Sequence, residues 1–346
     1  MAMGYQPRFS ISSAYLKSAE AIQRLQTLIE TAPIQVPWAA ALERDALAQS
    51  AHGTAAIEGN PLSLNEVKTL MDGKPLTHAP PRAVYDIRNV LELLRDVERK
   101  ALSPSGLCEA DIHEFHRILG RQNTLERDPV GKYRNYGVEV GDHKGTHPND
   151  IPKRMADLIE WVQGEGQQWP PLVTSAVLHF RFEFIHPYGD GNGRVGRAWM
   201  LAELYRRQFK TRHVFSIEEI LWEKRWDYFA ALQSAGIHPE QDLTHWLEFS
   251  AEALHLALER AWARIERLPA SPEADDLMLT PNQERLLELL REKPLGIAAI
   301  QKALRVTKPG AHHILKPLMN IHLIERIGGH KTGKYRLRLP KPKIEV

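Results

Sequence analysis

The chain contains very little cysteine and no long apolar run. Cys108 is the single cysteine among 346 residues, which excludes a disulfide framework and a zinc site built on paired thiolates. We therefore expect a reducing, cytoplasmic environment. No apolar run approaches the roughly 18 residues that a membrane span needs, and the opening MAMGYQPRFSISS lacks the apolar core of a secretory signal. The sequence predicts a soluble protein without a membrane partner.

The chain also has almost no net charge. The balance of 45 Lys and Arg against 43 Asp and Glu gives +2, which argues against nucleic acid binding over the whole surface. The charge is unevenly distributed, however. From Thr280 onward, 14 basic residues face 5 acidic ones, a net charge of +9, and the remaining 31 basic and 38 acidic residues give −7. The sequence thus predicts an acidic body and a basic tail.

Repeats and low-complexity tracts are absent, and the length suits about two domains. From about Tyr15 to Arg267, apolar residues recur every three or four positions, which predicts helix almost throughout. The exception is Lys132–Pro148, where KYRNYGVEVGDHKGTHP alternates and is rich in glycine, as in a short β-hairpin. We predict a helical region at 1–100, a helical core at 101–267 with a flap at 132–148, a linker at 268–280 and a tail domain at 281–346.

The predicted fold class is therefore all-α with a small hairpin, followed by a winged helix-turn-helix domain. The tail shows three helical patterns, then two alternating runs around Gly328 and Gly329. The residues predicted to face DNA are Lys308, His312 and Lys316 on the third pattern and Lys331 and Lys334 in the wing. Such phosphate contacts give affinity for DNA without sequence specificity. Winged helices also dock proteins or form dimers, and a basic surface can simply be solvated, so all these alternatives stay open.

The most informative segment is the loop HPYGDGNGRVGR, from His186 to Arg197, between two helical patterns. Its glycines Gly189, Gly191 and Gly193 let backbone N–H groups turn toward an anion. The helix that follows adds the positive end of its dipole at the same place. The pattern predicts an anion site at a helix N-terminus.

Charged side chains extend this prediction. Arg194 and Arg197 lie one turn apart and can reach the same anion with forked donors. Asp190 supplies one oxygen ligand for Mg²⁺, and His186 can accept a proton near neutral pH. A plain glycine turn with scattered arginines is the alternative, but the joint spacing favours a polyphosphate site with a metal and a base.

This segment resembles the signature of the Fic family, HxFx[D/E]GNGRxxR, and departs from it only at Tyr188, where Phe is usual. The resemblance extends over roughly Ala39 to Leu254. It implies transfer of AMP from ATP to a Ser, Thr or Tyr hydroxyl of a target protein, or of the chain itself, with Mg²⁺. Members of the family often form dimers, so a homodimer is possible.

The resemblance also implies roles for single residues. His186 would deprotonate the target hydroxyl, and Asp190 would hold Mg²⁺. The residues implied to bind ATP are Gly189, Gly191, Asn192, Gly193, Arg194 and Arg197, with Arg197 on the γ-phosphate. The flap gives a separate expectation: Val138 and Val140, or their neighbours, line up a target segment by strand addition, because a flap edge offers unpaired backbone groups.

A second segment resembles the family's inhibitory pattern [S/T]xxxE[G/N]. Thr54, Glu58 and Gly59 match it, at the end of a helix predicted from about residue 38 to residue 59. Glu58 would then pair with Arg197 and occupy the arginine needed by the γ-phosphate. A surface glutamate before a glycine helix stop is the alternative. Two other functions stay open: removal of AMP from a modified protein, and a DNA-binding transcriptional regulator whose Fic domain senses nucleotide.

Overall fold

The structure is a computed structural model that describes residues 4–34, 36–103, 106–126, 129–140, 143–207, 209, 211, 213–237, 242–268, 280–320, 324–327 and 333–337. It divides into two compact units. One comprises Met1–Glu30 and Ala46–Ala261, and the other Thr31–Asp45 and Trp262–Val346. In the described residues, no helix is both long and apolar enough to cross a membrane.

The first unit is built almost entirely from helices, as predicted. These are α1 (Ser13–Thr31), α2 (Val36–Ile57), α3 (Leu64–Met71), α4 (Pro81–Ala101), α5 (Glu109–Leu119), α6 (Ile151–Gln163), α7 (Pro171–Ile185), α8 (Asn192–Arg206), α9 (Ile217–Glu223), α10 (Arg225–Ile237) and α11 (Thr244–Glu266). Three short 3₁₀ turns join them, at Arg121–Asn123, Pro148–Asp150 and Glu165–Gln168. The start of α2 and the end of α11 belong to the second unit.

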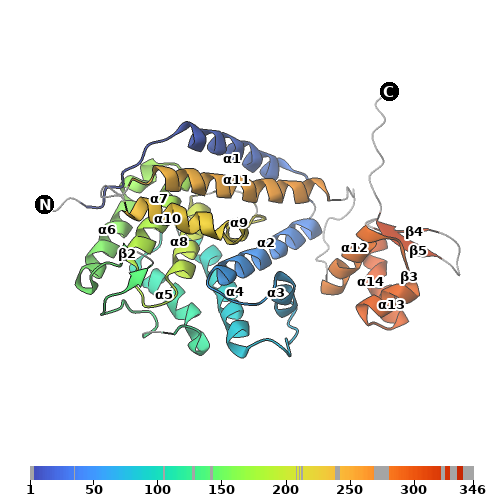
Figure 1. Cartoon of the computed structure of the whole chain (residues 1–346). Coiled ribbons are helices and arrows are strands. Elements are labelled where there is room, and N and C mark those ends of the chain that lie inside the picture. The colour runs from blue at the N-terminus through green and yellow to red at the C-terminus, as the bar shows by residue number, and fades with distance from the viewer. Residues whose placement is uncertain are drawn as a thin grey trace, which may run out of the picture. The chain divides into compact units, whose positions relative to one another are not determined.

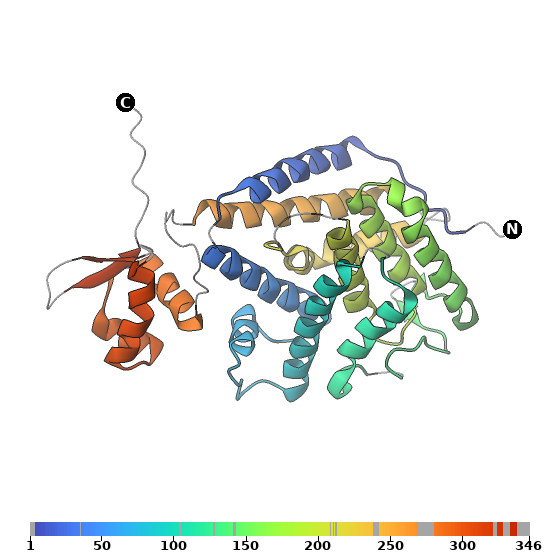
Figure 2. The same cartoon turned by 180° about the vertical axis from the view of Figure 1, so that it is seen from behind.

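Helices α7 and α8 form the centre of the first unit (Figure 1). Most residues of both helices are buried, charged ones on α8 included, so neither helix has a solvent face of the usual amphipathic kind. Helices α4 and α5 pack against α8, and α6 packs against α7. The indole Nε1 of Trp246 on α11 donates to the carbonyl of Ala176 on α7 at 2.8 Å. Helix α1 lies along α11 in both views (Figure 2). The loop between α7 and α8 thus joins two helices that are largely buried in the unit.

A short β-hairpin interrupts the helices within residues 132–148. Strand β1 (Glu139–Val140) pairs antiparallel with β2 (His143–Lys144), and Val140 lies opposite His143. Val138 precedes β1, and its carbonyl accepts a hydrogen bond from the Gly145 amide at 3.0 Å. The predicted hairpin is therefore present, although each strand is only two residues long.

The tail of the second unit contains α12 (Pro281–Glu292), β3 (Leu295–Gly296), α13 (Ile297–Leu304), α14 (Lys308–Asn320), β4 (Ile324–Ile327) and β5 (Lys334–Leu337). The strands form an antiparallel sheet in the order β3-β5-β4. Trp38, from the start of α2, is buried in this unit together with Leu286 and Leu318. The second helical pattern of the tail predicts a helix from Leu295 to Leu304, and this was wrong at its first two residues, because they pair with β5. Most of the predicted linker 268–280, with Gly328, Gly329 and Lys331, lies outside the described residues.

Candidate active site

The loop between α7 and α8 is shaped by two left-handed backbone positions. His186 ends α7 with φ 51° and ψ 63°, and its amide donates to the Phe182 carbonyl at 2.9 Å. Gly191 precedes α8 with φ 81°. Because left-handed backbone is uncommon for a residue with a side chain, His186 holds its conformation at a cost that the surrounding contacts must offset.

Two side chains lock this loop. Both ends of the Asn192 amide bind the backbone of Tyr188: Oδ1 accepts from its N–H at 2.9 Å, and Nδ2 donates to its carbonyl at 2.8 Å. The Tyr188 ring is fully buried, and its hydroxyl lies 2.8 Å from Nδ1 of His113. The one departure from the family signature therefore places a buried hydroxyl beside a partner. The role of Asn192 as a phosphate ligand stays a prediction, since its amide is engaged within the loop.

His116 supports the same loop from α5. It is fully buried and stacks on Tyr188 with 3.9 Å between ring centroids. The Gly131 amide donates to its Nδ1 at 2.8 Å, so the ring hydrogen sits on Nε2 and points to the Asp190 carbonyl at 3.1 Å. Burial lowers the pKa of His116 to about 4, although Asp190 favours the charged form. The imidazole is thus neutral near pH 7 and bridges the Gly131 amide and the Asp190 carbonyl.

Asp190 is anchored but keeps capacity for a further ligand. Its Oδ1 accepts from the Gly191 amide at 2.6 Å and from Nη2 of Arg194 at 3.2 Å, and Oδ2 accepts from the Glu126 amide at 3.0 Å. A carboxylate has about four acceptor positions, so one stays available on Oδ2. That fits a ligand that contributes a single oxygen to Mg²⁺. Among the described residues, no group of three or more His, Cys, Asp or Glu side chains could hold a metal ion.

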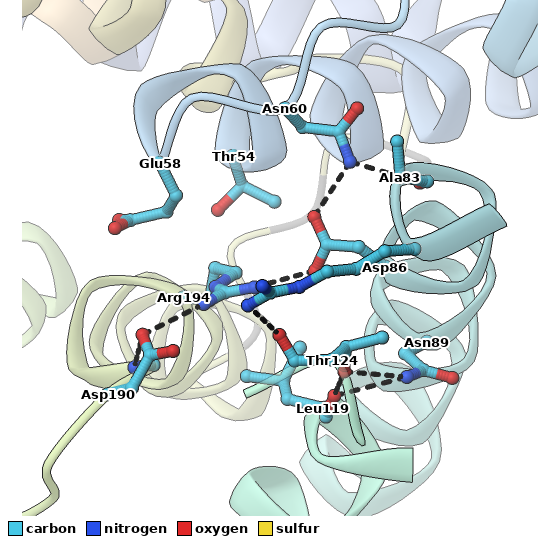
Figure 3. Close-up of polar contacts among 12 residues, drawn as sticks. Thr54, Glu58, Asn60, Ala83, Asp86, Asn89, Leu119, Thr124, Asp190 and Arg194 are labelled. Atoms are coloured by element: carbon cyan, nitrogen blue, oxygen red, sulfur yellow. Dashed lines mark hydrogen bonds and ion pairs between the residues drawn. The ribbon is translucent and has the colours of Figure 1, made fainter. Parts of the chain in front are cut away.

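Arg194 is buried between two carboxylates. Its side chain is 7% exposed, and Nη1 donates to Oδ1 of Asp86 at 2.6 Å, in addition to the contact with Asp190. Asp86 comes from α4 and was missed in the sequence reading (Figure 3). No motif marks it, because it meets Arg194 only through the packing of α4 on α8.

The other motif arginine, Arg197, is paired with the end of α2. Its Nη2 lies 2.7 Å from Oε1 of Glu58, and its Nε donates to Oγ1 of Thr54 at 2.7 Å. The same Nη2 donates to the Thr54 carbonyl at 3.0 Å. Burial lowers the pKa of Arg197, but Tyr228 and Glu58 together raise it above its ordinary value, so the guanidinium stays charged. The pairing that the sequence predicted for Glu58 is present.

Three further groups lie near Arg197: the buried Tyr228 and His179 and the partly buried Glu183. The Tyr228 hydroxyl is 3.5 Å from Nη1 of Arg197 and 2.8 Å from Nε2 of His179. Burial lowers the pKa of His179 to about 3 and raises that of Glu183 to about 8, although the positive charge of Arg197 partly opposes the rise for Glu183. Glu58 is the carboxylate that forms the ion pair with Arg197, at 2.7 Å.

His186 is half-buried at the opening of the loop. Its Nδ1 lies 3.3 Å from the Glu183 carbonyl, which can only accept, so the neutral ring carries its hydrogen on Nδ1. The backbone carbonyl of His186 accepts from Nε of Arg134 at 2.8 Å. In this tautomer, Nε2 is the nitrogen that can take a proton.

A cavity of about 560 Å³ lies beside Glu58, Asp190 and Arg194. It is lined by Glu58, Gly59, Asn60, Pro61, Pro80, Arg82, Ala83, Asp86, Thr124, Glu126, Gly189, Asp190 and Arg194. The end of α2, the start of α4 and the glycine-rich loop thus enclose one polar space. Its volume is in the range of ordinary small-ligand sites.

The predicted DNA-facing residues of the tail lie on one exposed helix face and one strand. Lys308, His312 and Lys316 are exposed at four-residue spacing on α14, and Lys334 is exposed in β5. Lys331 lies outside the described residues. The arrangement is compatible with contacts to phosphate groups, which stays a prediction.

Comparisons with known proteins agree with the motif and the fold. Residues 106–204 match the model of the Fic/DOC family, and the glycine-rich loop lies within this matched segment. The crystal structure of a Fic family protein from Desulfovibrio desulfuricans G20 is 27% identical, covers 98% of this chain and 100% of that one, and superposes with a TM-score of 0.66. Fic-1 from C. elegans is 21% identical with a TM-score of 0.62 over 74% of each chain, which shows the fold alone.

Proteins that are named as adenylyltransferases are also similar to this chain. "Protein adenylyltransferase Fic" from Nematostella vectensis is 28% identical over 236 residues, which are 66% of this chain and 52% of that protein. "Protein adenylyltransferase fic-1" from Caenorhabditis elegans is 25% identical over 68% of this chain and 45% of its own length. The chain thus spans about half the length of these relatives.

Proposed function

We propose that the chain is a protein adenylyltransferase held in an inhibited state by Glu58. The observation that carries the proposal is the 2.7 Å ion pair between Glu58 and Arg197 within a complete loop of the Fic type. The names of the similar proteins support the reaction class. The products would be an AMP-modified hydroxyl of a target protein, or of the chain itself, and pyrophosphate.

The loop contains the groups that this reaction needs. Nε2 of His186 takes the proton of the target hydroxyl, whose oxygen attacks the α-phosphorus of ATP. The bond from that phosphorus to the bridging oxygen breaks, and pyrophosphate leaves with the electron pair. Arg194, the amide of Gly193 and the N-terminus of α8 stabilise charge on the phosphate oxygens. Mg²⁺, held by Asp190 together with the phosphates, would neutralise part of that charge when bound.

The inhibition follows from position and charge. Glu58 forms an ion pair with the guanidinium of Arg197, which would otherwise bind the γ-phosphate. Its carboxylate would also repel a triphosphate at the same place. ATP bound in this state would lack one anchor, so its α-phosphorus would be poorly aligned for in-line attack.

The test is incubation with Mg²⁺ and ATP labelled on the α-phosphate. We expect Glu58→Gly to raise label transfer to protein, and the Glu58→Gly/His186→Ala variant to abolish it, which shows that the label depends on the loop. Equal labelling of the wild type and Glu58→Gly at saturating ATP contradicts the inhibitory role. No labelling in any variant contradicts the reaction.

A second activity has a structural basis in the same glutamate. Glu58 lines the cavity, and its side chain is 31% exposed, so the carboxylate can contact water. It could therefore orient a water molecule that removes AMP from a modified protein. Loss of label from pre-modified protein with the wild type, but not with Glu58→Gly, would identify this reverse activity.

For the tail we propose a winged helix that binds duplex DNA through α14. The support is the element order α12-β3-α13-α14-β4-β5 and the exposed Lys308, His312 and Lys316 on α14. Docking of a protein by the same face is the alternative. Tight DNA binding combined with no AMP transfer in any variant would favour a regulator that only senses nucleotide.

A further inference from the structure

The end of α2 is held at a second point besides Glu58. Nδ2 of Asn60 donates to the Ala83 carbonyl at 3.0 Å and to Oδ2 of Asp86 at 2.8 Å, both at the start of α4 (Figure 3). Oδ1 of Asn60 accepts from the Leu62 amide at 3.1 Å. The Asn60 side chain thus uses both of its ends, one within its own turn and one on α4.

The backbone of this turn fixes how Glu58 and Asn60 are presented. Gly59 adopts φ 88°, and the Asn60 amide donates to the Ala55 carbonyl at 3.0 Å, as in a helix C-terminal cap. Glu58 and Asn60 flank the glycine in one short turn, so a movement that withdraws one of them strains the contacts of the other.

Asp86 connects Asn60 with the catalytic loop. One oxygen of its carboxylate accepts from Asn60, and the other accepts from Nη1 of Arg194 at 2.6 Å. Asp86 is 8% and Arg194 6% exposed, so each charge depends on the other as a counterion. Asp190, the second partner of Arg194, lies farther away at 3.2 Å. Asp86 therefore has the larger part in fixing the direction of the Arg194 guanidinium.

We infer that Asn60 and Asp86 form a second latch on the site, in which Asp86 positions Arg194 and Asn60 ties that carboxylate to the turn carrying Glu58. The inference rests on the function proposed above for the same loop. Both motif arginines are then linked to the residues that flank Gly59: Arg197 directly through Glu58, and Arg194 through Asp86 and Asn60. Release of the inhibitory glutamate requires the bonds of Asn60 to break as well.

The first experiment measures the latch without any catalysis. Asn60→Asp keeps the oxygen that accepts from Leu62, but it removes the donor and brings a like charge to Asp86. Asn65→Asp is the matched control, because Asn65 is exposed at the start of α3 and the change of charge is the same. We expect amide hydrogen exchange of residues 54–62 to rise about tenfold in Asn60→Asp, as for one lost hydrogen bond to a charged group. Equal exchange in the two variants overturns the latch.

The second experiment measures labelled AMP transfer. We expect Asn60→Asp to raise transfer above the wild type but less than Glu58→Gly does, since Glu58 still reaches Arg197 for part of the time. Transfer by Asn60→Asp at the level of Asn65→Asp overturns the regulatory part of the inference. If no variant transfers AMP, including Glu58→Gly, the proposed function fails, and the exchange experiment still decides on the latch.

The positioning role of Asp86 has its own readout. In a Glu58→Gly background, Asp86→Asn removes the charge that orients Arg194 but keeps the size of the side chain. We expect KM for ATP to rise about tenfold with a smaller change in kcat, because Arg194 then binds phosphate from a less ordered position. A merely structural role would lower the unfolding midpoint and leave KM unchanged, and that result overturns the assignment.

Discussion

Gly193 and Glu58 approach each other so closely that a Cβ atom at Gly193 would lie 2.3 Å from Oε1 of Glu58 and 3.0 Å from Nη1 of Arg197. The ion pair therefore occupies the space directly above the start of α8. The absence of a side chain at Gly193 serves the inhibited state as well as phosphate binding.

This contact predicts that Gly193→Ala is destabilising only while Glu58 is present. We expect a loss of about 1–2 kcal/mol in the free energy of unfolding in the wild type, because the carboxylate must shift from its arginine. In a Glu58→Gly background the same change should be neutral, or stabilising by up to about 1 kcal/mol, because alanine favours helix. Urea unfolding of the four proteins measures the coupling, and equal losses in both backgrounds would contradict it.

His116 provides a prediction about the loop itself. His116→Ala removes a fully buried ring, its stack on Tyr188 and the partners of the Gly131 amide and the Asp190 carbonyl. We expect a loss of about 2–4 kcal/mol in the free energy of unfolding. His113→Ala is the control, because His113 is only half-buried and should cost less. If His116→Ala lowers the free energy of unfolding less than His113→Ala does, the His116 contacts to Gly131 and Asp190 contribute little to stability.

The sequence predicted the local motif from His186 to Arg197, but it did not predict residues that reach the loop from distant helices. The spacing from His186 to Arg197 is local, so the loop and the helix after it could be predicted from the order of residues. The two-residue strand β3 could not, because only its pairing with β5 defines it. Asp86 lies 108 positions before Arg194, and His116 lies 74 before Asp190. Their contribution depends on how α4 and α5 pack against the loop, and no short-range pattern encodes that packing.

Asn192 illustrates the same limit within the motif. The family resemblance implied that it binds phosphate, and the structure shows its amide bonded at both ends to Tyr188. A spacing of four residues is compatible with either arrangement. The side-chain direction becomes fixed only when the loop folds on His116 and Phe182.

Glu183 predicts a dependence of stability on pH. Its pKa is raised to about 8 in the folded protein, mainly by burial, from an ordinary value near 4.5. Above that ordinary value the unfolded chain loses a proton that the folded protein retains, so stability falls as the pH rises toward 8, by at most about 1.4 kcal/mol per pH unit. His179 has the opposite effect, but only below pH 6.5, since its folded pKa is lowered to about 3.

The window from pH 6.5 to 8 therefore separates the effect of Glu183 from that of His179. We expect the wild type to lose stability across it relative to Glu183→Gln, which cannot ionise. Urea unfolding at several pH values measures the difference between the two proteins. Parallel profiles would mean that Glu183 is already ionised in the folded state, with Arg197 as its counterion in place of a proton.

The tail gives a prediction that separates DNA binding from a solvated basic surface. Each lysine that contacts a phosphate contributes about 0.9 to the slope of log K against log salt concentration. Lys308→Ala/Lys316→Ala removes two exposed charges from one face of α14 and should lower the slope by about 2, with a similar loss of affinity for unrelated duplexes. Lys302→Ala/Lys293→Ala is the control, because both lysines lie outside α14 and the total charge removed is the same. Equal slopes for the two double variants would mean that the tail attracts DNA only through its net charge. No measurable DNA binding by the wild type at low salt would leave α14 as a face for a protein partner.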